Sequence, residues 1–131
     1  MTLERAQSLI AAALAAGRAR GTRPLAAVVV DAGGHIVASA REDGATIARH
    51  DFALAKAWSC IALGLDTRDL VERVEANPAF FSAAATLLSG RLLPAAGGVL
   101  VREDEQILGA LGVSGDAAEV DDACAIAAIG R

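Results

Sequence analysis

Apolar residues recur with two different periods along the first third of the chain, and the periods predict its first elements. From residue 3 to residue 18 they follow the spacing of an amphipathic helix, with Thr2 in position to cap its start. A β-branched run over residues 25–30 predicts a buried strand, and residues 35–41 alternate as a second strand. The turn signal between them predicts a β-hairpin. In the second strand we expect one face to carry Ile36, Ala38 and Ala40.

The rest of the chain repeats the order of helix and hairpin. We expect a helix over 48–63, two shorter helices over 67–77 and 78–88, strands over 99–102 and 106–113, and a last helix over 118–129. Because short turns join each pair of strands, the sheet should be antiparallel and covered by helices. The pattern predicts one α/β (α+β) domain over residues 1–131.

Composition narrows the classes of partner. The formal net charge is −4 and aromatic residues make up 3% of the chain, so we expect no nucleic-acid partner. No uncharged apolar run reaches the ~18 residues that a membrane span needs, and Glu4 interrupts what would be the basic leader of a signal peptide. Each of the two cysteines, Cys60 and Cys124, lies in an apolar helical pattern, which predicts small buried side chains in a reducing, cytoplasmic setting.

Lys56 is the only lysine, and it lies inside an apolar stretch. On a helix it shares one face with Arg49, Phe52, Ala53, Ser59, Cys60 and Leu63. Because that face includes apolar residues, we expect Lys56 to be partly buried. A buried ammonium needs a carboxylate, carbonyl groups or an anionic ligand. The pattern is therefore compatible with a structural Lys–Asp pair, a snorkelling stem, or a ligand contact.

Other polar residues and glycines mark further candidate sites. Arg41 and Asp43 follow the second strand, where charged side chains line either a ligand cleft or an ordinary turn. His50 is compatible with a surface or capping residue and with a ligand or acid–base residue. Two lone histidines, His35 and His50, predict no metal site, although haem needs only one imidazole.

The glycine-rich stretches are Gly97-Gly98 and residues 109–115. The second has the spacing GxxGxxG, which is not the dinucleotide fingerprint GxGxxG, and only 16 residues follow it. We expect these glycines to allow close approach of the backbone to neighbouring elements.

Four stretches, in this order, resemble the GlcG/HbpS-like family, which includes the C-terminal domain of PduO-type proteins. They are VVVDAGGHIVASAREDGA (28–45), ALAKAWS (53–59), GGVLV (97–101) and GALGVSGDAAEVD (109–121). The resemblance covers nearly the whole chain. This chain departs from the usual family strings at Glu42, Ser59, Leu100 and Val120, where methionine, threonine, proline and glutamine are common.

The resemblance implies a profilin-like or roadblock-like fold with a five-stranded antiparallel sheet flanked by helices. It also implies homo-oligomers, from dimers to octamers, and ligands such as haem or corrinoid. By family motif, the pocket or framework positions are Asp43, Lys56, Gly97, Gly98 and Asp121.

These observations favour a small-molecule-binding protein whose ligand is haem, a corrinoid or a small organic acid. Its expected ligand contacts are Arg41, Asp43, Arg49, Lys56, Gly97 and Gly98. The alternative is an isomerase, lyase or hydrolase acting on an oxyacid. In that enzyme Lys56 or Arg49 would hold the anion, and His50 or Asp43 would move a proton, so the catalytic candidates are His50, Asp43 and Lys56. A third possibility is an assembly protein without a ligand, which associates through alanine-rich faces.

Overall fold

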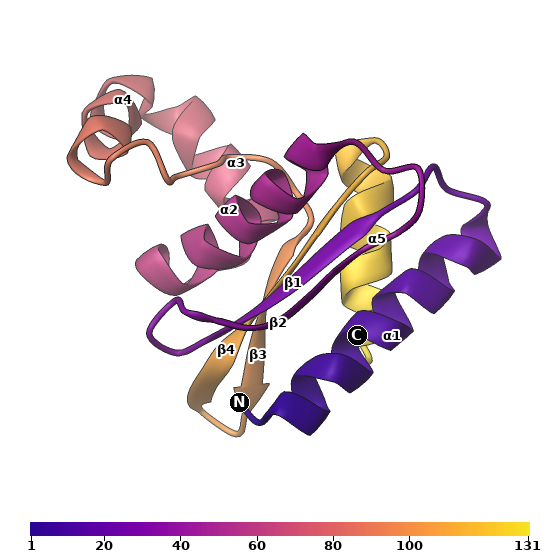
Figure 1. Ribbon diagram of the computed structural model, residues 1–131. Helices are drawn as coiled ribbons and strands as arrows, with labels where there is room; N and C mark the ends of the chain where they lie inside the picture. Colours follow the sequence, from indigo (N-terminus) through magenta and orange to yellow (C-terminus); the bar gives the residue numbers. More distant parts are fainter.

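A four-stranded antiparallel sheet lies between two layers of helices in the computed structural model, which describes all residues from Met1 to Arg131 (Figure 1). The element order is α1 (Leu3–Arg20), β1 (Ala26–Asp31), β2 (Ile36–Arg41), α2 (Ile47–Leu63), α3 (Thr67–Ala76), α4 (Pro78–Leu87), β3 (Gly98–Glu103), β4 (Gln106–Ser114) and α5 (Ala118–Ala128). These elements confirm the helices and the two hairpins expected from the periodicity.

The strands lie in the order β2-β1-β4-β3, and every neighbouring pair is antiparallel. The family resemblance implies five strands, and the sheet has four, so that expectation is wrong by one strand. The chain contains only the four strand segments of its two hairpins, and residues 91–97, which lead into β3, form no strand. Pro94 lies in that segment and lacks the backbone N–H that a sheet ladder requires.

The pleat of β1 divides the core between the two faces of the sheet. Ala27 and Val29 are buried against α1 and α5, whereas Val28 and Val30 are buried against α2. Because β1 is buried on both faces, it reads as a continuous apolar run. Its position in the middle of the sheet fixes α2 on one face and the pair α1 and α5 on the other (Figure 1).

A β-bulge interrupts the β1–β2 hairpin near Val37. Val29 pairs with Ala38, but Val30 pairs with Ile36, so one extra residue lies in β2. Because directly paired residues project to the same face, the bulge directs Ile36 to the α2 side and leaves Ala38 on the α1 side. The expectation that Ile36 shares a face with Ala38 and Ala40 is therefore wrong, since strict alternation ignores the extra residue.

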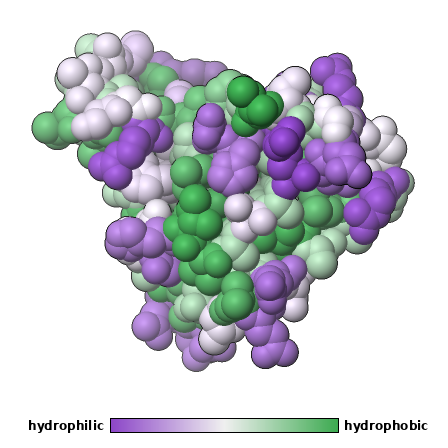
Figure 2. Space-filling model, viewed as in Figure 1, coloured by the Kyte–Doolittle hydropathy of each residue, from purple (hydrophilic) through white to green (hydrophobic).

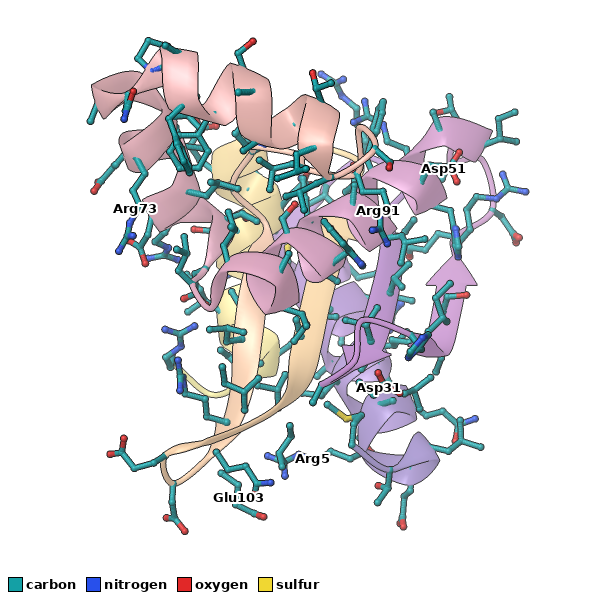
Figure 3. All side chains as sticks on the ribbon, turned by 90° about the vertical axis from the view of Figure 1, so that its left-hand side faces the viewer. Arg5, Asp31, Asp51, Arg73, Arg91 and Glu103 are labelled. Atoms are coloured by element: carbon teal, nitrogen blue, oxygen red, sulfur yellow. The ribbon has the colours of Figure 1, made fainter.

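The start of α3 is tied to β3 by side chains. Asp66 Oδ1 accepts a hydrogen bond from the backbone N–H of Leu100 (2.7 Å), and Thr67 Oγ1 accepts one from the N–H of Gly98 (2.8 Å). At the far end of the sheet, Arg5 on α1 lies 3.6 Å from Glu103 at the end of β3 (Figure 3).

α4 projects from the body of the molecule and has no buried residue (Figure 1). Phe80 and Leu87 are among its exposed apolar side chains, with 58% and 82% of their surface accessible. Apolar atoms are also exposed along the middle of the face shown in Figure 2. None of the helices combines the length and the apolar composition needed to cross a membrane.

Gly112 lies where β4 packs against α2, and its replacement tests how close these elements must be. A Cβ at this position would overlap the backbone carbonyl oxygen of Ala53. Because backbone cannot move aside as a side chain can, Gly112→Ala should lower the free energy of unfolding by about 3 kcal/mol or more in denaturant titrations. The control is Gly33→Ala, whose new methyl would meet only side-chain atoms, those of His35 and Asp31, and a loss of equal size in both variants would contradict this account.

Candidate functional site

The side chain of Lys56 is buried, as its position in an apolar helix predicts, with 3% of the residue accessible. Its ammonium donates hydrogen bonds to the backbone carbonyl of Val113 (2.9 Å) and to Asp121 Oδ2 (3.1 Å). Of the alternatives left open by the sequence, the structure shows the structural Lys–Asp pair. An ammonium has three N–H donors, so one remains after these two contacts.

Asp121 lies at the start of α5 and is itself 1% accessible. Besides Lys56, it accepts hydrogen bonds from the backbone N–H groups of Gly115 (3.3 Å) and Asp116 (2.9 Å). The ion pair therefore joins α2, the end of β4 and the start of α5 through one carboxylate. A buried pair with this many hydrogen bonds satisfies the condition under which buried charges are tolerated.

Burial and ion pairing act on these two groups in opposite directions. Burial raises the pKa of the Asp121 carboxyl and lowers the pKa of the Lys56 ammonium, because both charged forms lose hydration. The attraction between the two charges opposes both shifts, and the nearby Arg49 guanidinium lowers the Lys56 pKa further. In both groups the burial effect is the larger, so the pair joins three elements but stabilises the fold little relative to an apolar contact.

A hollow of about 250 Å³ opens beside this pair, and we call it the Lys56 hollow. Its lining residues are Arg49, Phe52, Lys56, Leu93, Ala95, Ser114, Asp116, Ala118 and Asp121. Arg49 is half-buried and forms no ion pair, and its guanidinium carbon lies 6.0 Å from the centre of the Phe52 ring. The hollow therefore contains one cation that forms no ion pair, next to the Lys56 ammonium, and the Arg49 charge also lowers the pKa of the Asp116 carboxyl in the same hollow.

The structure brings some of the expected site residues together and separates others. Gly97 borders the Lys56 ammonium, with a φ of +123° that a residue with a Cβ rarely adopts. Gly98 contacts the backbone of Lys56, so the paired glycines act as framework against α2. In contrast, Arg41 and Asp43 line a different hollow of about 450 Å³. His50 is half-buried on α2 and lines neither hollow.

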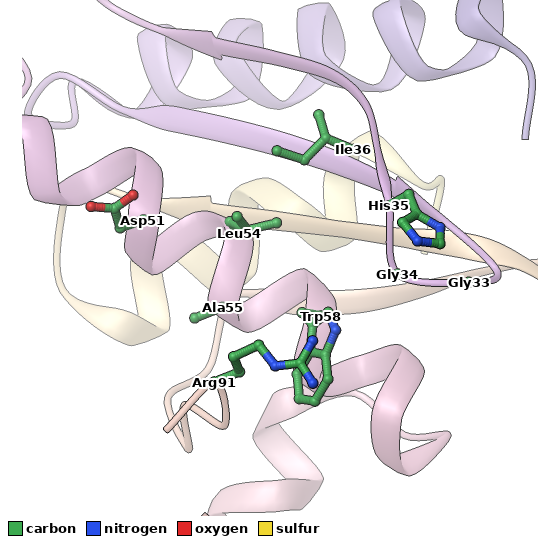
Figure 4. A pocket seen from close by; sticks show the side chains of 9 residues that line it. All are labelled: Gly33, Gly34, His35, Ile36, Asp51, Leu54, Ala55, Trp58 and Arg91. Atoms are coloured by element: carbon green, nitrogen blue, oxygen red, sulfur yellow. The ribbon is translucent and has the colours of Figure 1, made fainter. Parts of the chain in front are cut away.

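A larger cleft of about 510 Å³ lies between α2 and the β1–β2 turn, and the sequence reasoning missed it. We call it the Trp58 cleft; it is lined by Gly33, Gly34, His35, Ile36, Asp51, Leu54, Ala55, Trp58 and Arg91 (Figure 4). A signal was present, since the single tryptophan of the chain shares a helical face with Leu54. The contribution of Ile36 depends on the bulge and could not be inferred from alternation.

Both cysteines are buried and unpaired, as their apolar surroundings predict. Burial raises the pKa of the Cys60 and Cys124 thiols above the ordinary value, which disfavours the reactive thiolate. No cluster of histidine, cysteine, aspartate and glutamate side chains is arranged to hold a metal ion.

Comparisons with known proteins give consistent results. A family model described as "Haem degrading protein HbpS-like" matches residues 1–130. The corrinoid adenosyltransferase PduO of Citrobacter freundii is 28% identical over 98 residues, which cover 75% of this chain and 29% of that protein. The matched region therefore spans less than a third of the length of PduO.

Solved structures extend the similarity to nearly the whole fold. Protein ORFY of Klebsiella pneumoniae has a TM-score of 0.90 and 30% sequence identity, covering 98% of this chain and 88% of that one. The crystal structure of a PduOC:heme complex has a TM-score of 0.89 and 26% identity, covering 98% of this chain and 92% of that one.

Replacing Lys56 tests the role of the buried pair. Lys56→Met leaves the Asp121 carboxylate buried without its cation and should lower the free energy of unfolding by about 3–5 kcal/mol. Adding Asp121→Asn removes the stranded charge and keeps one oxygen, which can accept from the N–H of Gly115 or that of Asp116 but not from both, so the double variant should recover part of that loss. Chemical denaturation of the wild type and both variants measures the difference; a double variant no more stable than Lys56→Met would contradict the explanation.

Proposed function

The chain belongs to the HbpS-like family, and we propose that it is a small-molecule-binding protein that holds a small organic anion in the Lys56 hollow. One solved relative is a PduOC:heme complex, which supports ligand binding by this fold in general. The proposal for this chain rests on one observation within it: Arg49 lines the hollow beside the buried Lys56 and forms no ion pair.

The size and charge of the hollow favour a small acid. Pockets that take drug-sized ligands measure roughly 300–1,000 Å³, and the Lys56 hollow measures about 250 Å³. The planar guanidinium of Arg49 matches the two oxygens of a carboxylate. The remaining N–H of Lys56 supplies a second donor, and Phe52, Leu93 and Ala95 supply an apolar wall. These groups recognise a short carboxylic or hydroxy acid.

Binding is favoured over catalysis by the positions of the acid–base candidates. The enzyme alternative needs His50 or Asp43 beside the anion, but neither lines the Lys56 hollow. Asp116 does line it, and hydrogen bonds from the backbone N–H groups of Arg23 and Ala117 lower its pKa. A carboxylate held ionised in this way is a poor proton donor near neutral pH.

Haem is the ligand that the family suggests first, and its iron needs an axial ligand from the protein. Haem iron takes an axial histidine, cysteine, methionine or tyrosine. None of these residues lines the Lys56 hollow. In the Trp58 cleft the only such residue is His35, whose side chain is 84% accessible and lies 3.5 Å from Asp31. Neither the Lys56 hollow nor the Trp58 cleft therefore encloses an axial ligand for haem, and the Lys56 hollow is too small for a corrinoid.

We also propose that the chain forms a homo-oligomer, between a dimer and an octamer. The support within this chain is α4, an apolar helix without a buried residue, which exposes Phe80 and Leu87. Light scattering coupled to size-exclusion chromatography measures the number of copies, and a monomer at all accessible concentrations would remove this part of the proposal.

Thermal unfolding with glycolate, lactate and oxalate tests the anion site. A ligand that binds only the folded state at 100 times its Kd stabilises it by about 2.7 kcal/mol, so at least one acid should raise Tm. Arg49→Gln removes the charged hydrogen bonds and should weaken binding roughly tenfold or more. The control is Arg73→Gln, which removes the same charge from the exposed face of α3 (Figure 3). Equal Tm shifts in wild type and Arg49→Gln would refute the site.

A haemin titration tests whether the missing axial ligand matters. Because neither the Lys56 hollow nor the Trp58 cleft encloses a residue that can ligate the iron, we expect micromolar haemin to give no sharp, shifted Soret band of an imidazole-ligated complex. The comparison variant is His35→Ala, because His35 is the only histidine that lines the Trp58 cleft, and no histidine lines the Lys56 hollow. A shifted Soret band in the wild type would overturn the conclusion, and its loss in His35→Ala would move the haem site to the Trp58 cleft.

A further inference from the structure

We propose that the Trp58 cleft is a second binding site, separate from the Lys56 hollow, and that it takes an elongated aromatic carboxylate. The cleft has about twice the volume of the Lys56 hollow, and the two share no lining residue. The proposal therefore does not rest on the anion site beside Lys56. It rests on a polar group at each end of the cleft and an apolar middle between them (Figure 4).

One wall of the cleft is a single face of α2. Asp51, Leu54, Ala55 and Trp58 have the spacing i, i+3, i+4, i+7, which places them in one row along the helix. From the first to the last of these residues the helix rises about 10 Å. The floor of the cleft is the side chain of Leu54, which packs against the core under α2. The site is therefore built on a rigid element.

The opposite wall is the β1–β2 hairpin. Gly34 adopts a φ of +82°, and a Cβ there would lie 3.0 Å from Trp58 Cδ1, so the turn can approach the indole closely only because this residue is glycine. The bulge near Val37 directs Ile36 toward α2. Ile36 is 47% accessible, so about half of this large apolar side chain is in contact with water. A ligand body lying between Ile36 and Leu54 would remove this surface from water.

Two donors without anionic partners lie at one end. The guanidinium carbon of Arg91 lies 4.0 Å from the centre of the Trp58 ring, and Arg91 forms no ion pair. The indole N–H of Trp58 has no hydrogen-bond acceptor in the protein. A guanidinium held on an aromatic face is pre-positioned for a carboxylate, and the indole N–H adds a donor beside it. The geometry therefore assigns the carboxylate of the ligand to this end.

The other end carries the opposite charge. Asp51 lies two turns earlier on α2 and forms neither an ion pair nor a side-chain hydrogen bond. A carboxylate there repels a second anionic group and accepts a hydrogen bond from a hydroxyl or amine. The preferred ligand therefore has its carboxylate and a donor group at opposite ends of an aromatic body. The edge of the Trp58 ring offers such a body an edge-to-face contact.

Nuclear magnetic resonance tests this site directly, because the chain has one tryptophan and hence one indole N–H signal. Cinnamate is the probe, and cinnamyl alcohol is its uncharged counterpart. We expect cinnamate to shift the indole signal saturably with a Kd near or below about 1 mM, and the alcohol to bind roughly tenfold more weakly. Absence of saturation at about 10 mM, or equal affinities for the two probes, would overturn the proposal.

Single substitutions test which group of the ligand binds at each end of the Trp58 cleft. Arg91→Gln should weaken cinnamate binding roughly tenfold and leave cinnamyl alcohol binding unchanged. 4-Hydroxycinnamate should bind more tightly than cinnamate, and Asp51→Ala should abolish that advantage. Arg73→Gln is the control for lost positive charge. Arg49→Gln should leave cinnamate binding intact, so failure of the Lys56 hollow and failure of this cleft are distinguishable. Unchanged cinnamate affinity in Arg91→Gln would remove the assigned carboxylate end.

Discussion

The buried ammonium of Lys56 is the constraint around which this half of the structure is arranged. Its two acceptors are a carbonyl of β4 and a carboxylate of α5, so α2 cannot shift on the sheet without breaking both contacts. The same carboxylate holds the backbone between β4 and α5. The charges lose hydration on burial, so their value lies in the arrangement they specify more than in stability. The small hollow beside them is a consequence of that arrangement.

The two candidate sites lie on nearly opposite sides of the same helix, α2. α2 directs Lys56 and Ser59 inward, where Lys56 donates to the Val113 carbonyl and the Asp121 carboxylate, and Ser59 accepts from the backbone N–H of Leu93. On nearly the opposite side of the helix, roughly 160° around from Lys56, it presents Leu54 and Trp58 toward the β1–β2 hairpin, where charged groups remain without ion-pair partners. On the inward side, one N–H of Lys56 and the guanidinium of Arg49 remain available, and around the cleft Asp51 and Arg91 form no ion pair. Unused groups in a concave, partly apolar setting are what a ligand site requires.

Much of this fold was predictable from sequence, because its helices and hairpins carry clear periodicities and turn signals. The burial of Lys56 followed from its apolar neighbours, and the family motif marked Asp121 as a pocket or framework position, but the pairing of the two residues was not predicted. What could not be predicted depends on events between distant segments. The bulge near Val37 reverses the face of Ile36, and the stacking of Arg91 on Trp58 joins residues separated by α3 and α4. The prediction from local pattern also put Asp43 and Lys56 in one cleft, whereas they line different hollows.

Because Asp66 and Thr67 contact β3, the two edge strands of the sheet differ in how many of their outward backbone groups are free. On β3 the outward N–H groups of Gly98 and Leu100 are already occupied by these side chains. The outward backbone of β2 has no such cover. An extended segment from another polypeptide would therefore find free backbone hydrogen-bonding groups along β2. A strand from such a segment can widen the sheet at the β2 edge but not at the β3 edge.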